Sequence, residues 1–378
     1  MVYIVTTESF PRGLAATQRI RCYAESLVRL GQRCEVLCVN RLEDPAHPLG
    51  NTAPRGELDG YTYRYLGRST RLPGNPVSRK LVQAADTLRL AVYLLRSARR
   101  SDKLIFYSYS PRLQRLVLRL SALVGFEAYL ELNEHPEIHY RGAKPGNLRR
   151  FAGILCISRS LKQLLQESGI PAERIHEVPM AVSEARFTGL ARQAGPPCVA
   201  YCGAADNAKD GVDRLLRAFA DVSPQHPEYR LRILGPKRAG CANERLAEEL
   251  GILDKVEFAG MASSDALPQQ LVDARILALA RPQSLQAQYG FPTKLGEYLL
   301  SGNPVVVTAV GDIPLYLKDG ESAYLAEPDS VEAFAAKLAA AMDAPAEAAE
   351  IGARGRTVAL ENFSLARVAE RLKEALGL

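Results

Sequence analysis

The chain has 378 residues, of which 47% are hydrophobic and 24% are charged, and its formal net charge is +6. This length has room for two domains with separate cores, and the composition excludes a disordered or collagen-like chain. No run of 18 apolar residues is present, so we expect no transmembrane helix.

In the first half of the chain, short β-branched segments alternate with amphipathic ones, which predicts βαβ units and a parallel sheet. In chain order we expect a strand at 2–6, a helix at 17–30, a strand at 35–39, a helix at 79–100, a strand at 103–109, a helix at 112–124, strands at 128–133 and 153–158, and a helix at 160–168.

The alternation restarts after Gly195-Pro196-Pro197, which has the composition of a linker. We expect a strand at 198–202, a helix at 211–222, a strand at 231–234, a helix at 243–250, a strand at 256–258, a helix at 267–272, a strand at 275–279, a helix at 293–301, a strand from 304, and helices at 331–342, 346–361 and 364–376.

The sequence therefore predicts an α/β protein with two doubly wound, Rossmann-like domains facing a central cleft. Residues 1–190 form the first domain and 191–360 the second, and a C-terminal helix within 361–378 packs back toward the first. Open α/β sheets bind ligands at the carboxyl ends of their strands, so we expect the site there.

Seven cysteines are present, an odd number, and several lie inside aliphatic runs. Such positions are typical of small buried side chains in a reducing cytosol. Cys34 and Cys38, and likewise Cys198 and Cys202, have the spacing of a metal half-site. Each pair lies in a strand pattern without a nearby histidine. The sequence therefore predicts a cytoplasmic protein with no metal site.

Positive charge is concentrated in the first half of the chain. Residues 1–190 contain 28 Lys and Arg against 17 Asp and Glu, and the remainder contains 20 against 25. This asymmetry indicates an anionic partner for the first half, and nucleic acid and a membrane surface are the generic choices. No RNA- or DNA-binding motif is present, so nucleic acid is not expected.

The most informative segment is Tyr289-Gly-Phe-Pro-Thr-Lys-Leu-Gly-Glu297. A Gly-Phe-Pro-Thr turn leads into a short helix that ends at Gly302, and the N-terminus of such a helix suits a diphosphate. Glu297 lies one turn further on, where its carboxylate can accept hydrogen bonds from a ribose diol. The segment resembles the nucleotide-sugar clamp of the retaining GT-B glycosyltransferases of family 4, the glycosyl transferases group 1.

The resemblance implies that the clamp binds the donor through Phe291, Pro292, Thr293, Lys294 and Glu297. Glu297 matches the second carboxylate of the family's Glu-x7-Glu motif, but the first position is Tyr289. The Tyr289 phenol, or a neighbour such as Gln288, then contacts the sugar, or else the protein is a poor catalyst. By itself, Glu297 also fits a helix-surface pair with Lys294.

Two further segments resemble donor-binding loops of the family. Tyr201-Cys-Gly203 followed by Lys209-Asp-Gly211 resembles its Gly…Lys-Gly turn, with an additional Asp and without the arginine that often follows the first Gly. The resemblance implies that Lys209 contacts the donor diphosphate as a point charge and takes part in catalysis, whereas the residues alone also allow a solvated loop lysine.

The segments around Gly235 and around Phe258 and Gly260 resemble the turn beside the phosphates and the segment that cups the nucleotide base. In the first half, Gly13 precedes a helix in a small-residue loop that resembles the family's N-terminal loop, where the donor phosphates approach the backbone. The family places a histidine after the strand at 128–133, near the reacting sugar, which implies catalytic roles for His135 and neighbouring Glu134. A solvated loop histidine is the alternative.

By resemblance, a sugar moves from a UDP- or GDP-sugar to a glycan or lipid-linked acceptor with retention at the anomeric carbon. Lys209, Lys294 and the helix N-terminus at Thr293 stabilise the leaving diphosphate. No Asp-x-Asp is present, so we expect a metal-independent enzyme without a cofactor.

Two predicted helices carry an apolar stripe beside a row of arginines. Leu81, Leu88 and Leu95 belong to the first stripe, and Leu113, Val117 and Leu120 to the second. The loop at 141–150 adds Lys144, Arg149 and Arg150. Such a surface suits the headgroups of a membrane contacted peripherally or a lipid-linked acceptor, whereas two buried stripes with solvated arginines are the alternative. The arginines are Arg89, Arg96, Arg100, Arg112, Arg115 and Arg119.

Two other functions fit the sequence. The family motif has a glutamate where this chain has Tyr289, and often an arginine where it has Ala204. These two differences suggest the alternative of a GT-B pseudoenzyme that docks at a membrane and supports an active partner. A nucleotide-sugar 2-epimerase is the third possibility, but it needs more acid and base side chains than these segments offer.

Overall fold

The computed structural model describes residues 1–44, 49–140, 148–236 and 242–378, and these form two compact units. The first unit consists of Met1–Val182 and Leu365–Leu378, and the second of Ser183–Ser364. The chain therefore changes unit after Val182 and after Ser364, whereas the sequence placed the boundaries after residues 190 and 360.

Side-chain contacts explain these positions. Arg186 pairs with Glu297 and therefore belongs with the second unit. Phe363 is the last residue of α14 and also belongs with the second unit. Its ring packs against the rings of Phe291 and Tyr316, with centroids 5.7 and 4.9 Å apart.

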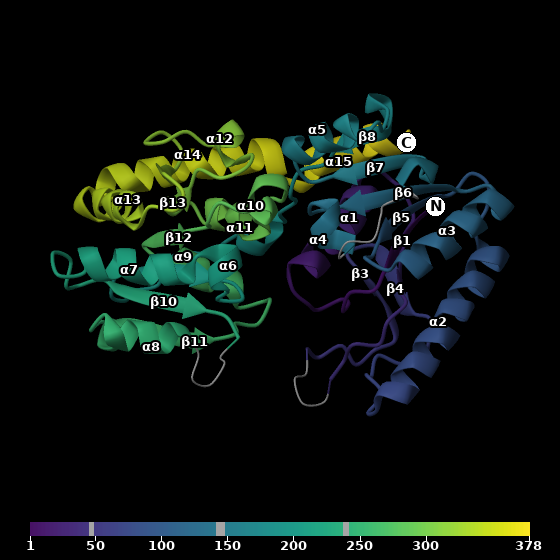
Figure 1. Ribbon diagram of the computed structural model, residues 1–378, viewed down its shortest axis with the longest axis horizontal. Helices are drawn as coiled ribbons and strands as arrows, with labels where there is room; N and C mark the ends of the chain where they lie inside the picture. The colour runs from purple at the N-terminus through teal and green to yellow at the C-terminus, as the bar shows by residue number, and fades with distance from the viewer. Residues whose placement is uncertain (45–48, 141–147, 237–241) are drawn as a thin grey trace. The chain divides into compact units, whose positions relative to one another are not determined.

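A sheet of the order β3-β4-β2-β1-β5-β6-β7-β8 forms the centre of the first unit (Figure 1). All neighbouring strands are parallel except the β3–β4 hairpin. The five strands predicted in this half are confirmed, and β3, β4 and β8 are additional. The strands are β1 (Val2–Thr6), β2 (Cys34–Cys38), β3 (Arg55–Leu58), β4 (Tyr61–Tyr65), β5 (Lys103–Tyr107), β6 (Glu127–Leu132), β7 (Gly153–Cys156) and β8 (Ile175–Glu177).

The predicted helices of this unit are also confirmed, and their ends follow local rules. The third helix, for example, starts after the Ser110 cap with Pro111 in its first turn and ends at Gly125, whose φ is 94°. The helices are α1 (Ala15–Arg29), α2 (Pro76–Ser97), α3 (Pro111–Val124), α4 (Pro136–Tyr140), α5 (Arg159–Glu167) and α15 (Leu365–Leu376).

The last helix completes the core of the first unit. α15 packs along α1, and its side chains Val368, Leu372 and Leu376 share one buried cluster with Ile20 and Tyr23 of α1. The C-terminal segment is therefore a structural part of the unit that contains the N-terminus.

The second unit contains a parallel sheet of the order β11-β10-β9-β12-β13-β14. In chain order this is 3-2-1-4-5-6, the Rossmann arrangement, in which ligands bind where the order reverses, at the carboxyl ends of the first and fourth strands. Those strands are β9 and β12. The six strands are β9 (Cys198–Cys202), β10 (Arg230–Leu234), β11 (Val256–Gly260), β12 (Ile276–Leu279), β13 (Val305–Thr308) and β14 (Tyr324–Ala326).

The helices predicted for the second half are confirmed, and three short ones are additional: α6, α10 and α12. None of the described helices combines the length and the apolar content needed to cross a bilayer. The helices are α6 (Asn207–Asp210), α7 (Val212–Val222), α8 (Ala242–Glu249), α9 (Leu267–Asp273), α10 (Leu285–Tyr289), α11 (Thr293–Leu300), α12 (Ile313–Tyr316), α13 (Val331–Asp343) and α14 (Pro345–Phe363).

Candidate functional site

Glycine-containing loops lie side by side at the carboxyl ends of β9, β10 and β11. The Gly203 amide donates to the Leu234 carbonyl oxygen at 2.8 Å, and the Gly235 amide donates to the Gly260 carbonyl oxygen at 2.9 Å. A Cβ on Gly235 would overlap the Gly203 carbonyl oxygen, and a Cβ on Gly203 would overlap Lys294 Nζ. Glycine is therefore required at position 235, where the overlap is with backbone, whereas a side chain at position 203 would displace the Lys294 ammonium. Phe258, half-buried, lies on the same strand as Gly260.

A buried ion pair lies beside Gly203. Lys294 Nζ donates to Asp210 Oδ2 at 2.6 Å and to the Tyr201 hydroxyl at 3.1 Å, and that hydroxyl donates to Asp210 Oδ2 at 2.7 Å. The Lys294 ammonium also lies 4.6 Å from the centre of the Tyr201 ring. The Asp210 side chain is 3% exposed and that of Lys294 is 18% exposed. The aspartate inserted in the Lys-Asp-Gly turn is thus the counter-ion of Lys294, a role that the sequence analysis missed.

The pair remains charged although it is buried. Burial alone would raise the pKa of Asp210, but Lys294, Tyr201 and Arg281 hold that pKa below its ordinary value. Burial lowers the pKa of Lys294, and the negative charge of Asp210 opposes this effect. The carboxylate and the ammonium therefore stabilise each other in a place where neither would be stable alone.

Lys209 lies next to this pair. It belongs to α6, whose cap Asp206 accepts a hydrogen bond from the Lys209 amide at 3.0 Å, and its side chain is exposed. Arg281, 2% exposed at the end of β12, donates through Nε to the Lys209 carbonyl oxygen at 3.3 Å. Two cations, Lys294 and Arg281, and the Asp210 carboxylate thus lie near the point where the strand order reverses, and Lys209 directly precedes Asp210 in the chain. Such a surplus of positive charge suits a diphosphate.

Glu297 pairs with Arg186. The Arg186 guanidinium donates to Glu297 Oε1 and, through its other terminal nitrogen, to the Ser264 carbonyl oxygen at 2.8 Å. The Arg186 and Glu297 side chains are 19% and 18% exposed. The pair between Lys294 and Glu297 on one helix surface, which the sequence alone allowed, is wrong, because Lys294 is bonded to Asp210 instead. Sequence analysis did not identify Arg186.

The rest of the clamp surrounds the start of α11. Pro292 precedes Thr293 as the N-cap and contributes no side-chain hydrogen bond, so no side chain caps the amides of Thr293 and Lys294, whereas the Leu295 amide donates to the Pro292 carbonyl oxygen at 2.9 Å. Phe291 is 7% exposed, and its ring meets that of Tyr316 edge-on at 5.6 Å, so the structure gives Phe291 a packing role. Tyr289 is half-buried at the end of α10.

In the first unit, polar residues follow the neighbouring strands β1, β5 and β6. The hydroxyls of Thr7 and Ser108 share a hydrogen bond of 2.9 Å, and Asn133 Nδ2 donates to the Tyr107 hydroxyl at 2.8 Å. Glu134 and His135 follow Asn133 at the same carboxyl edge. The His135 Nδ1 accepts the Glu137 amide at 3.3 Å.

Gly13 lies just before α1. A Cβ there would overlap Thr17 Oγ1, whose hydroxyl donates to the Ser9 carbonyl oxygen at 2.7 Å. The cap residue of α1, Leu14, contributes no side-chain hydrogen bond. Glu8 lies in the same segment, and burial raises the pKa of its carboxyl group. Sequence analysis had no signal for Glu8.

A buried network that the sequence analysis also missed fixes the position of α1. Arg19 Nε donates to Glu131 Oε1 at 2.7 Å, and the Tyr23 hydroxyl donates to Glu131 Oε2 at 2.9 Å. The two terminal nitrogens of Arg19 donate to the carbonyl oxygens of Pro179 and Val178 at 2.7 Å each. Every partner is buried, so this network ties α1 to β6 and to the end of the first unit's main segment.

The two predicted apolar stripes differ in the structure. Leu113, Val117 and Leu120 of α3 are buried, whereas Leu81 and Leu88 of α2 are 67% and 66% exposed. The predicted basic residues are exposed, and Arg89 also donates to Asp86 Oδ1 at 2.5 Å. Lys144 lies outside the described residues. The exposed predicted arginines are Arg89, Arg96, Arg100, Arg112, Arg115 and Arg119, and the nearby Arg149 and Arg150 are exposed as well.

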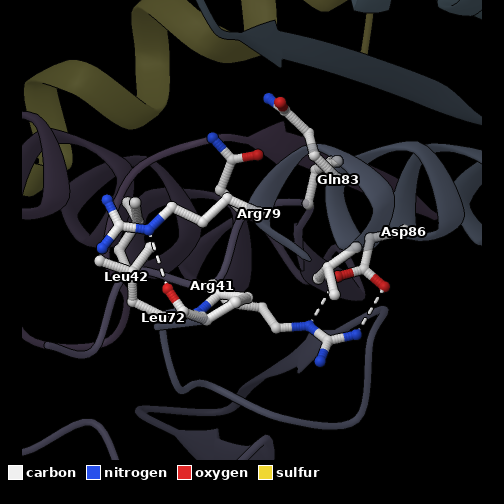
Figure 2. Close-up of a pocket in the computed structure, with 10 residues that line it drawn as sticks. Arg41, Leu42, Leu72, Arg79, Gln83 and Asp86 are labelled. Carbon is white, nitrogen blue, oxygen red and sulfur yellow. Dashed lines mark hydrogen bonds and ion pairs between the residues drawn. The ribbon is translucent and has the colours of Figure 1, made fainter. Parts of the chain in front are cut away.

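A separate hollow of about 130 Å³ lies against α2 in the first unit (Figure 2). Its lining includes Arg41, Arg79 and Asp86, and both oxygens of Asp86 accept hydrogen bonds from Arg41 at 2.7 and 3.0 Å. No predicted site residue lines this hollow. Among the described residues, no group of three or more His, Cys, Asp or Glu side chains could hold a metal ion.

Comparison with known families shows which proteins the second unit resembles in sequence. Residues 196–344, which include the glycine-containing loops of the second unit and the start of α11, match the family model described as "Glycosyl transferases group 1". Over this segment the chain is similar to the glycosyl transferases group 1. The sequence-based recognition of this family is thus confirmed.

A curated relative supports the same relationship. The chain is 30% identical over 224 residues to an MMP alpha-(1->4)-mannosyltransferase from Mycolicibacterium hassiacum, and the match covers 58% of this chain and 53% of that protein. The chain spans about half the length of this curated relative.

Solved structures match both units. A sucrose-phosphate synthase from Thermosynechococcus elongatus has a TM-score of 0.77 at 16% identity, and the match covers 100% of this chain and 98% of that one. Anabaena HepE in complex with UDP-glucose has a TM-score of 0.72 at 13% identity, with 100% and 99% covered. At these identities the likeness concerns the fold, and it confirms the predicted GT-B fold class of two Rossmann-like domains.

Proposed function

We propose that this protein is a retaining glycosyltransferase, which moves a sugar from a UDP- or GDP-sugar to a glycan or lipid-linked acceptor in the synthesis of a surface polysaccharide or glycoconjugate. The observation that carries the proposal is the cationic cluster at the reversal point of the second sheet, in a segment that is similar to a glycosyl transferase family. The mannosyltransferase relative and the complex of HepE with UDP-glucose support this class of donor.

The cluster suits the diphosphate of the donor. When the bond between the anomeric carbon and the diphosphate breaks, its electron pair stays on the diphosphate, whose negative charge increases. Lys209, Lys294, Arg281 and the start of α11 at Thr293 present positive charge there before the reaction begins, so no reorganisation is required. The bare backbone at Gly203 and Gly235 allows a phosphate to come close.

The remaining residues have roles in orientation. Glu297 binds the ribose hydroxyls of the donor after its carboxylate is released from Arg186. Tyr289 contacts the transferred sugar in place of the carboxylate that the family motif carries. Gly13, Glu134 and His135 of the first unit act on the sugar and the acceptor.

Charge stabilisation in this proposal comes from the chain's own cations, so the proposed reaction requires no metal ion and no cofactor. The proposed location is the cytoplasm. The six described cysteines support it, because no two of them form a disulfide and five of the six are buried.

Calorimetric titration with UDP, GDP and ADP, without added metal, tests the proposal first. We expect saturable binding of UDP or GDP, and transfer from the matching sugar donor with the anomeric configuration retained by NMR. The Lys209→Gln variant is expected to lose at least tenfold in transfer rate, whereas Lys318→Gln, an exposed lysine elsewhere in the same unit, keeps it.

Three results would overturn the proposal. Absence of binding by all three nucleotides would remove the donor site. Binding of a nucleotide without turnover of any donor would favour the pseudoenzyme. Conversion of the donor to its 2-epimer without transfer would favour the epimerase.

A further inference from the structure

The longest helix of the first unit exposes a row of large apolar side chains. Val77, Leu81, Leu88, Val92 and Leu95 of α2 are 68%, 67%, 66%, 40% and 48% exposed. We call these five residues the α2 face. They make up a large share of the exposed large hydrophobic residues among those the structure describes, and no other helix contributes as many. Contiguous exposed apolar surface of this kind marks a site of interaction.

The α2 face is separate from the face that packs on the protein. The buried residues of α2 are Asp86, Leu90 and Leu94. At 3.6 residues per turn, the five exposed side chains fall within an arc of about 60°, and the buried three fall on the opposite side of the helix. The helix is therefore apolar on two faces, of which only one is covered within the described residues.

Basic side chains flank the α2 face on both sides. Around the helix, Lys80 lies about 60° to one side of the arc, and Arg89 and Arg96 lie on the other. Arg99 and Arg100 follow the end of the helix. Among the described residues, no carboxylate lies within 4.0 Å of the charged groups of Lys80, Arg96, Arg99 or Arg100. Their charge is therefore available to an anionic partner.

Residues 76–100 contain one acidic residue, and it cannot oppose this charge. Asp86 is 1% exposed and accepts hydrogen bonds from Arg41, as Figure 2 shows, and also from Arg89. The neighbouring helix α3 adds Arg112, Arg115 and Arg119, which are exposed and have no carboxylate partner among the described residues. Two copies of such a surface would repel each other, which disfavours self-association through α2.

We propose that α2 docks on an anionic lipid bilayer, with the α2 face in the interface between headgroups and acyl chains and the flanking lysine and arginines at the phosphates. A helix with an apolar face bordered by basic residues lies in the plane of such an interface, its apolar side chains about 5–10 Å deep. The 22 residues of α2 provide about 33 Å of contact length. This docking does not depend on the proposed glycosyltransferase activity, so the two proposals fail independently.

The chain contains no tryptophan, which provides a site-specific probe. A Leu88→Trp variant carries one indole on the α2 face, and Leu315→Trp carries one at an exposed leucine of the second unit, 53% exposed. With vesicles of phosphatidylcholine and phosphatidylglycerol, we expect blue-shifted emission and quenching by brominated acyl chains for Leu88→Trp alone. Equal responses of the two variants, or no response of either, would overturn the proposal.

Matched variants separate the contribution of the basic residues to membrane binding from that of the apolar residues. The triple variant Arg96→Gln, Arg99→Gln, Arg100→Gln is expected to partition roughly a hundredfold less onto anionic vesicles, at about fivefold for each basic residue. The double variant Leu81→Gln, Leu88→Gln is expected to lose at least tenfold, and Leu253→Gln, Leu315→Gln is expected to lose nothing. All of these leucines are exposed, so each variant is expected to retain the wild-type circular dichroism spectrum.

Two outcomes would refute the lipid assignment. Equal partition onto pure phosphatidylcholine and onto anionic vesicles would show that the arginines play no part. A dimer in light scattering that dissociates in the Leu81→Gln, Leu88→Gln variant, without vesicle binding by the wild type, would show that the α2 face is occupied by a second copy of the chain.

Discussion

Replacing Asp210 with asparagine tests the buried ion pair at the candidate site. The change keeps the size of the side chain and removes its charge, so Lys294 loses its counter-ion in a place where its side chain is 18% exposed. Breaking a buried pair from one side costs about 3–5 kcal/mol, because the remaining charge is left uncompensated. We expect Asp210→Asn to lower the free energy of unfolding by about 3 kcal/mol, toward the lower limit, since Lys294 keeps some contact with water.

Thermal unfolding followed by circular dichroism measures this loss. For a unit of this size, 3 kcal/mol corresponds to a fall in Tm of about 6–12 °C. Asp206→Asn is the matched control, because Asp206 is exposed and asparagine caps a helix as well as aspartate does. We expect that control to change stability by less than about 0.5 kcal/mol.

The pH dependence gives a second readout. Because the pKa of Asp210 in the folded protein lies below its ordinary value of 3.8, its contribution to stability is complete at neutral pH. It decreases as the pH falls below 3.8, because the unfolded chain then binds the proton more readily than the folded protein does. The difference between wild type and Asp210→Asn should therefore shrink in this range. Equal stability of the two proteins at neutral pH would show that the ion pair does not stabilise the loop.

Three further predictions concern binding, folding and chemistry. Glu297→Gln should weaken the affinity for the nucleotide at least fivefold in calorimetry, since a charge-assisted hydrogen bond is lost, and unchanged affinity would remove Glu297 from the donor site. Arg19→Met should lower the free energy of unfolding in urea by about 3–5 kcal/mol, because Glu131 stays buried without its cation. The exposed control Arg29→Met should lower it by less than about 0.5 kcal/mol, and equal losses would contradict the network. Transfer activity should persist in excess EDTA, whereas loss that Mg²⁺ restores would show that the reaction requires a metal ion.

The regular elements were largely predictable because their signals are local. The strands of both sheets are continuous aliphatic or alternating segments, and the principal helices carry their own caps and periodicities, as in α3 with Ser110 and Gly125. The missed β3–β4 hairpin also has a local signal, the turn Asp59-Gly60, where both residues have positive φ. Short elements such as β8 and α12 are three and four residues long, too short for periodicity to identify them.

The exposure of the α2 face could not be predicted in this way. The apolar stripe of α3 became buried and that of α2 did not, although both have helical spacing. Burial depends on which elements pack against each helix, and the spacing of apolar residues within one helix carries no information about its neighbours.

The two doubly wound halves, the family and the loops that bear the candidate residues could all be inferred from the chain alone, since the glycines and the Phe-Pro-Thr-Lys segment form compact local motifs. The partners of the charged residues required the folded protein: Lys294 pairs with Asp210, 84 positions away, and Glu297 with Arg186, 111 positions away. Periodicity and motif spacing give information about residues that are close in the sequence. A buried charged side chain, however, pairs with whichever opposite charge the folded chain places near it. The identity of the pairing residue depends on the order of the strands in the folded sheets, which no local sequence pattern specifies.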